Sequence, residues 1–223
     1  MLSSVPPAAV WLLSIMALSG AWSHHGHAGD RQDGDSVETA PERTGNELVD
    51  RCNLCHGDKG QSDTSDIPSI GGFTGFAIME LFNTYRLGLR KARSLALPGG
   101  TETNMEEVVN SLSEEDEWTV SAYFSKQRWR PPEQPFDANL AALGAQIHEE
   151  RRDNCHHDGG RDPEFDLPIT AGQWREYLVA EFENFDNGRR KMPEKMKRKY
   201  DTLTAADKRA IIELYVSAGK YRE

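Results

Sequence analysis

The chain has 223 residues and a formal net charge of −10 at pH 7. An acidic balance of this size argues against a nucleic-acid-binding protein, because such proteins carry a basic balance or a basic face. The chain has three cysteines, so a framework of disulfides alone would leave one thiol over, and another chemical use of the thiols is favoured.

The first 41 residues predict a targeting segment and a leader. An apolar run over residues 8–20 is followed by the small-residue sequence AWS, which is typical of a cleaved secretory signal, although no Lys or Arg precedes the run. The run is shorter than the ~20 residues that span a bilayer, so a retained anchor is the less favoured alternative. We expect residues 1–23 to be a signal peptide for export. Residues 24–41 hold almost no large apolar residue and are expected to be a flexible leader.

The rest of the chain contains one segment twice. A shift of 100 residues aligns DIPSIGGFTGFAIMELFNTYRLG with DLPITAGQWREYLVAEFENFDNG, and a shift of 91 aligns MEEVVNSLSEEDEWTVSAYFS with MKRKYDTLTAADKRAIIELYV. Two copies of one small domain follow. We expect domains at residues 42–130 and 131–223, because the proline-rich stretch QRWRPPEQPFD between them stops a helix and stiffens a linker.

Helix signals recur in both copies, whereas no clear strand pattern is present. Ser113 with Asp116, and Thr204 with Asp207, have the spacing of a capping box that opens a helix. Apolar residues follow both at helical spacing. Further helices are expected in the segments ELVDRC and AQIHEERRDNC, which run into the cysteine motifs, and over residues 73–87 and 173–187. The chain is therefore predicted to be all-α, with two domains in tandem.

Cys52, Cys55 and His56 form the sequence C-x-x-C-H, the attachment sequence of a c-type haem. Two thiols one helical turn apart can each add to a vinyl group of the porphyrin, and the adjacent imidazole is then placed under the iron. A redox dithiol does not explain the histidine, and a zinc site needs a second ligand pair that the first copy lacks. We predict haem binding.

The sixth iron ligand is expected later in the same copy, and methionine is the usual choice where a high potential is needed. Met105 lies in the polar stretch GGTETNMEEV and agrees in register with Met196, whereas Met79 lies in an amphipathic run that is typical of core. A ligating imidazole also needs an acceptor for its other nitrogen. The carbonyls of Pro68 and Pro168 are placed to supply one.

The motifs CNLCHG, IPSIGG and LSEEDEWTVSAYFS resemble the first half of a dihaem class I cytochrome c of the cytochrome c4 type. The segments CHHDGGRD, ITAGQWREYL and RRKMPEKM resemble the dihaem cytochrome subunit of flavocytochrome c sulfide dehydrogenase. The resemblance implies two tandem class I cytochrome c domains in the periplasm. It also implies an electron-transfer subunit with no substrate chemistry of its own, which accepts electrons from an FAD-containing flavoprotein subunit and passes them to a soluble or membrane redox acceptor.

The resemblance also implies roles for single residues. In the first domain Cys52 and Cys55 would bind haem c covalently, and the iron would be ligated by His56 and Met105. In the second domain the corresponding residues are Cys155 for the thioether and, for the iron, His156 and Met196, with Met192 as an alternative to Met196.

Arg152 departs from the family pattern, since it stands where the second domain should have its first cysteine. The second haem could be held by one thioether from Cys155 together with the two iron ligands, it could be bound poorly or lost, or the domain could persist as a scaffold. We favour the single thioether, because the other residues of the site are kept and a lost haem would leave a cavity that a small core cannot tolerate.

The segment of residues 189–199 holds seven basic residues and one acid in an otherwise acidic chain. It is either a solvated helix flank or a docking face for an acidic redox partner, since complementary charge speeds encounter.

Three other functions compete with the sulfide dehydrogenase subunit. A free-standing dihaem shuttle to a terminal oxidase differs only in its partner. A haem peroxidase needs an open sixth position, which the methionine candidates argue against. A sensor or structural module would use the second domain only as a surface.

Overall fold

Helices make up much of the computed structural model, which describes residues 44–97, 99–162 and 167–220. The predicted signal peptide and leader lie outside these residues. We call residues 44–130 the N-terminal half and residue 131 onward the C-terminal half. Within the described residues, no helix has the length and apolar character needed to cross a bilayer.

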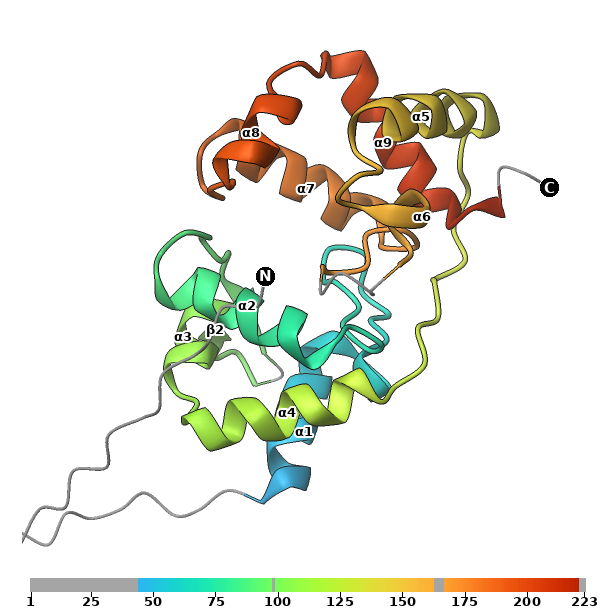
Figure 1. The fold of residues 1–223 in the computed structure, drawn as a ribbon. Coiled ribbons are helices and arrows are strands. Elements are labelled where there is room, and N and C mark those ends of the chain that lie inside the picture. Colours follow the sequence, from blue (N-terminus) through green and yellow to red (C-terminus); the bar gives the residue numbers. More distant parts are fainter. Residues whose placement is uncertain (1–43, 98, 163–166, 221–223) are drawn as a thin grey trace, which may run out of the picture. The chain divides into compact units, whose positions relative to one another are not determined.

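The N-terminal half contains four α-helices and a short hairpin (Figure 1). The elements are α1 (Gly45–His56), the 3-10 turn η1 (Asp58–Gly60), α2 (Gly75–Arg86), β1 (Leu95–Ala96), β2 (Glu102–Thr103), α3 (Met105–Asn110) and α4 (Glu114–Ser125). The two-residue strands pair antiparallel, a feature that the sequence pattern did not predict. Helices α1, α2 and α4 pack together around one apolar core.

The C-terminal half repeats this order of helices without the hairpin in its described part (Figure 1). The elements are α5 (Ala138–Arg151), the short turn α6 (His157–Gly160), α7 (Arg175–Asp186), α8 (Glu194–Tyr200) and α9 (Ala205–Ser217). Helices α5 and α9 cross at Gly144, where an added Cβ would lie 2.1 Å from the carbonyl oxygen of Ala210. Only glycine permits so close an approach.

The predicted capping boxes are confirmed. The Ser113 side chain accepts the amide of Asp116 at the start of α4, and the Thr204 side chain accepts the amide of Asp207 at the start of α9, with both carboxylates bonded back. A third box, Thr44 with Glu47, opens α1. Each box satisfies amide groups that a helix start leaves unbonded.

One predicted helix starts and ends earlier than expected, because α5 begins at Ala138 rather than after Gly144. The helix before the second cysteine motif was predicted to continue to residue 155, but α5 ends at Arg151. The following residue, Arg152, leaves helical geometry (φ −127°), and its side chain turns inward to donate from Nε to the hydroxyl of Tyr215 on α9. The inward turn of this side chain accounts for the early end of the helix.

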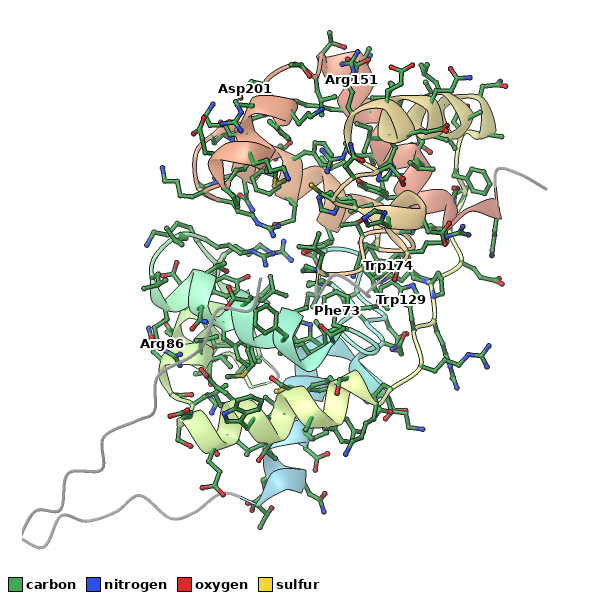
Figure 2. The ribbon with its side chains drawn as sticks, viewed as in Figure 1. Phe73, Arg86, Trp129, Arg151, Trp174 and Asp201 are labelled. Atoms are coloured by element: carbon green, nitrogen blue, oxygen red, sulfur yellow. The ribbon has the colours of Figure 1, made fainter. Side chains whose placement is uncertain are left out.

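Buried hydrogen bonds join the two halves. The side-chain amide of Gln173 accepts from the backbone N–H of Ser69 at 3.0 Å and donates to the Ser69 carbonyl at 2.8 Å. The indole of Trp174 donates to the Ser62 carbonyl at 2.8 Å. Trp174 is labelled in Figure 2 beside Trp129 and Phe73, whose rings stack with centroids 5.9 Å apart. These bonds fix α7 against the N-terminal half.

A second contact joins equivalent residues of the repeat. Arg90 and Arg190 form an antiparallel bridge, flanked by hydrogen bonds from Lys91 to the Arg189 carbonyl (2.9 Å) and from Lys191 to the Leu89 carbonyl (2.7 Å). The two copies therefore meet with approximate twofold symmetry, the arrangement expected when one domain packs against its own duplicate.

Candidate haem site

The first cysteine motif lies in the last turn of α1, so Cys52 and Cys55 are one helical turn apart. Both are free thiols and partly buried. Burial raises the pKa of Cys52 to about 11 and also raises that of Cys55. Redox-active dithiols instead have a lowered pKa. The raised pKa values of both thiols argue against a redox dithiol.

His56 is buried at the end of the same helix, and its Nδ1 lies 2.8 Å from the Pro68 carbonyl oxygen. A carbonyl can only accept, so Nδ1 carries the proton and the lone pair is on Nε2. Burial lowers the pKa of His56, which keeps the ring neutral. The prediction for Pro68 is confirmed, and His56 is held in the form that ligates a metal.

A cavity of about 500 Å³ brings Cys55, His56 and Met105 together. Its volume falls within the range of small-molecule and cofactor sites, ~300–1,000 Å³. Its apolar wall includes Ile70, Phe73, Ile78 and Phe82. Cys52 is not among the lining residues; it packs beside the cavity against the N-terminal core. The cavity, its apolar wall, the free Nε2 and the thioether sulfur fit a haem bound through this motif.

Met105 reaches the cavity from the first position of α3. The helix begins there because the Asn104 side chain caps it by accepting the amide of Glu107 at 3.0 Å. Both Met79 and Met105 pack against the N-terminal core, but Met79 does not line the cavity. The structure thus separates the two methionines as the sequence predicted, although ligation by Met105 stays a prediction.

The cavity also receives residues of α7 from the C-terminal half, which the sequence did not predict. Arg90 donates to the Tyr177 hydroxyl at 3.1 Å and pairs with Glu181 at 3.0 Å, and Arg190 also pairs with Glu181. Glu181 is a buried carboxylate at the position equivalent to Leu81. The replacement of the apolar Leu81 by an acid in the second copy was the feature of the sequence that could have predicted this contact.

The second cysteine motif keeps only part of this geometry. The Arg152 carbonyl accepts the amides of Cys155 (2.9 Å) and His156 (3.0 Å), so one helix-like turn remains. Cys155 is exposed and His156 is half-buried. Among the described residues no hydrogen bond joins His156 to Pro168, so the predicted carbonyl contact is wrong in this copy. The reason is that α5 ends early and the His156 backbone leaves helical geometry (φ −116°, ψ 70°).

The methionines of the second copy lie at the start of α8. Met196 is half-buried within α8, and Met192, which precedes the helix, packs against the C-terminal core. Neither lines the cavity of the first copy, nor do Cys155 and His156. The second ligand set therefore stays a prediction, with Met192 as the alternative to Met196.

Solved structures with this arrangement of helices decide the fold. Cytochrome c4 from Pseudomonas stutzeri, reduced and recombinant, is 22% identical with a TM-score of 0.61, over 77% of this chain and 95% of that chain. This chain has the two-domain fold of cytochrome c4. Cytochrome c4 from Acidithiobacillus ferrooxidans gives 20% identity and a TM-score of 0.61, over 75% of this chain and 99% of that chain. The prediction of an all-α chain with two tandem class I cytochrome c domains is confirmed.

The cytochrome c4 fold also occurs in a larger protein. Thiosulfate dehydrogenase (TsdBA) from Marichromatium purpuratum is 23% identical with a TM-score of 0.61, and the match covers 78% of this chain but only 39% of that chain. No protein-family model and no curated protein matches the sequence. The comparisons therefore show the fold, and function has to be argued from the site.

Proposed function

We propose that this chain is a periplasmic electron-transfer c-type cytochrome. In the N-terminal half, haem c would be attached to Cys52 and Cys55 and ligated by His56 and Met105. The observation that carries the proposal is that Cys55, His56 and Met105 line the same cavity, with Nε2 left as the free nitrogen of His56.

A bound haem supplies reversible one-electron transfer at its iron, and the chain supplies the conditions for it. The Pro68 carbonyl fixes the tautomer and orientation of His56. The thioether of Met105 is a soft donor, which favours reduced iron. The apolar wall keeps water away, and a sixth position filled by methionine argues against a peroxidase.

In the C-terminal half we propose a second haem c held by one thioether from Cys155, with His156 and Met196 as iron ligands. The turn retained between Arg152 and His156 supports this assignment. The same proposal takes residues 42–130 and 131–223 as the two domains. It also takes residues 1–23 as the signal peptide and 24–41 as the leader, so the mature chain would begin near residue 24.

For the partner, we propose an FAD-containing flavoprotein of the sulfide dehydrogenase type, followed by a soluble or membrane redox acceptor. The sequence resemblance supports this partner, and the occurrence of the fold in thiosulfate dehydrogenase shows that it serves in sulfur-compound oxidation elsewhere. A free-standing dihaem shuttle to a terminal oxidase is the second candidate, because the match covers nearly the whole length of both cytochromes c4.

The test is the intact mass of the mature, denatured protein, together with its iron content and alkaline pyridine haemochrome spectrum. Two covalent haems, one with a displaced haemochrome band, are expected. A Cys52→Ala/Cys55→Ala variant should lose the ordinary band and keep the displaced one. Absence of any covalent haem from protein made in a cytochrome c-maturing host would refute the proposal. A flavoprotein that co-purifies with the exported chain would favour the first partner over the shuttle.

A further inference from the structure

Three buried residues of the C-terminal half differ together from their equivalents in the N-terminal half. Leu48, Cys52 and Phe124 correspond to a histidine, an arginine and a tyrosine in the second copy, namely His148, Arg152 and Tyr215. These three are 2%, 9% and 1% exposed. Burying polar groups costs free energy unless they are paired, so three such changes at one place require an explanation.

Tyr215 contacts both of the other replacements through its side chain. The Nε of Arg152 donates to the Tyr215 hydroxyl at 3.1 Å. The rings of His148 and Tyr215 meet edge to face with centroids 5.8 Å apart. With phenylalanine at position 215, the Arg152 guanidinium would lose this partner. The three side chains therefore form one group centred on Tyr215, which we call the polar trio.

The polar trio adjoins the second cysteine motif. The Arg152 carbonyl accepts the amides of both Cys155 and His156, so the arginine sits at the base of the turn that carries them. Among the described residues no carboxylate lies within ion-pair distance of Arg152, whose Nε donates to the neutral Tyr215 hydroxyl. The carboxylate of Asp153 lies instead 3.9 Å from Nδ1 of His148.

An unpartnered polar atom points to a missing group here. Within the described residues, four buried side-chain atoms have no hydrogen-bond partner, and one of them is Nε2 of His148. Two of the others mark the first haem site, since Asn53 lies inside the C-x-x-C-H motif and Asp66 lines the cavity. The same kind of atom therefore occurs at both cysteine motifs.

We propose that the polar trio is a non-covalent replacement for the missing thioether, which positions the second haem and places the Arg152 charge beside it. This inference rests on the proposed function. A fixed positive charge favours the reduced form of a nearby iron, so Arg152 would raise the potential of the second centre above the value it would have without this charge.

The test is a pair of redox titrations on the full-length holoprotein, in which the displaced absorption band of the single-thioether haem separates the two centres. Arg152→Gln should lower the midpoint potential of the second centre and leave the first unchanged. The matched control is Arg151→Gln, which removes the same charge from a less buried position paired with Asp207 and should shift neither potential. Equal shifts at both centres, or no shift with Arg152→Gln, would overturn the proposal.

A second set of variants tests the trio as a unit. Arg152→Cys alone should bind haem poorly at the second site, because it leaves the buried Tyr215 hydroxyl without its partner. The triple variant His148→Leu/Arg152→Cys/Tyr215→Phe should restore haem incorporation at the second site. It should also move the displaced haemochrome band to the ordinary two-thioether position. If the single and triple variants load equally, the three residues are not a unit and the proposal fails.

The haem count of the unaltered protein separates the two proposals. With two haems, the titrations decide whether the trio acts as proposed. If the protein binds one haem, and the Cys52→Ala/Cys55→Ala variant loses it, then the proposed role of the polar trio is wrong and the proposed haem site of the N-terminal half is kept. With no haem, both proposals fail.

Discussion

Replacing Glu181 with glutamine should destabilise the contact between the two halves. Glu181 pairs with Arg90 at 3.0 Å, with side chains only 10% and 6% exposed, and also with Arg190. The Arg90 guanidinium is stacked 5.0 Å from the centre of the Tyr85 ring, so it cannot turn to solvent without losing that contact. Glutamine keeps the shape of the side chain and removes its charge, which leaves two guanidinium groups without their carboxylate.

The magnitude follows from the burial. Removing one partner of a buried ion pair costs about 3–5 kcal/mol. The lower end applies here, because Arg190 is 22% exposed and Arg90 keeps its bond to the Tyr177 hydroxyl. A loss of ~3 kcal/mol in a chain of this size corresponds to a fall in Tm of roughly 6–12 °C.

The effect should depend on pH with a definite sign. Burial alone would raise the pKa of Glu181, but the charges of Arg90 and Arg190 outweigh it and hold the pKa below its ordinary value of 4.5. A lowered carboxyl pKa stabilises the fold above the unfolded pKa, and this stability is lost as the pH falls through the folded pKa. The difference between wild type and Glu181→Gln should therefore be constant from pH 7 to 5.5 and shrink below about pH 4.

The assay is thermal and urea unfolding of the holoprotein followed by far-UV circular dichroism. Glu183→Gln is the control, because it removes the same charge from an exposed position on α7. A Glu181→Gln variant as stable at pH 7 as Glu183→Gln would refute the reasoning, since the ion pairs would then contribute nothing beyond their desolvation cost.

Three other predictions test the sites and the core. Met105→Ala should abolish the spectroscopic signature of methionine ligation at the first centre, whereas Met79→Ala should lower stability and leave that signature unchanged; the reverse result would assign the wrong methionine. Burial, and after it the charge of Arg152, lowers the pKa of His148 from 6.5 to about 4. The unfolded chain therefore binds a proton that the folded protein does not, and the protein should lose up to roughly 3 kcal/mol of stability as the pH falls from 6.5 to 4. A urea titration across this window should be flatter for His148→Leu, and equal slopes would contradict the lowered pKa. Gly144→Ala should cost about 1–3 kcal/mol because its Cβ would overlap the α9 backbone. Gly75→Ala should be neutral or stabilising in the same unfolding assay, because its Cβ would make only ordinary van der Waals contact, 3.9 Å from the Ser121 carbonyl oxygen.

Local sequence patterns predicted the parts of the fold that depend on neighbouring residues. The C-x-x-C-H motif, both predicted capping boxes and the helices over residues 73–87 and 173–187 depend on spacings of a few residues, and the structure shows them as α-helical elements with the expected caps. The contact between His56 and Pro68 spans twelve residues and was still predictable, because a ligating imidazole needs an acceptor.

Contacts between distant residues were not predictable from such spacings. Gln173 bonds to Ser69 across 104 residues, and Arg152 bonds to Tyr215 across 63. The early end of α5 follows from the second of these contacts, so a local pattern could not have placed it. The repeat nevertheless held a signal, because each of these polar contacts in the second copy falls where the first copy has a different residue type.

Two of the buried departures of the second copy from the first place charge near the cysteine motifs. Glu181 replaces the apolar Leu81 and pairs with an arginine of each copy, so the contact between the halves contains buried ion pairs. The polar trio replaces an apolar cluster next to the second cysteine motif. Burying polar groups unpaired costs several kcal/mol. Glu181 is paired with two arginines, and Arg152 donates to Tyr215. In the proposed protein with two haems, these charges would make two otherwise similar centres electrically different.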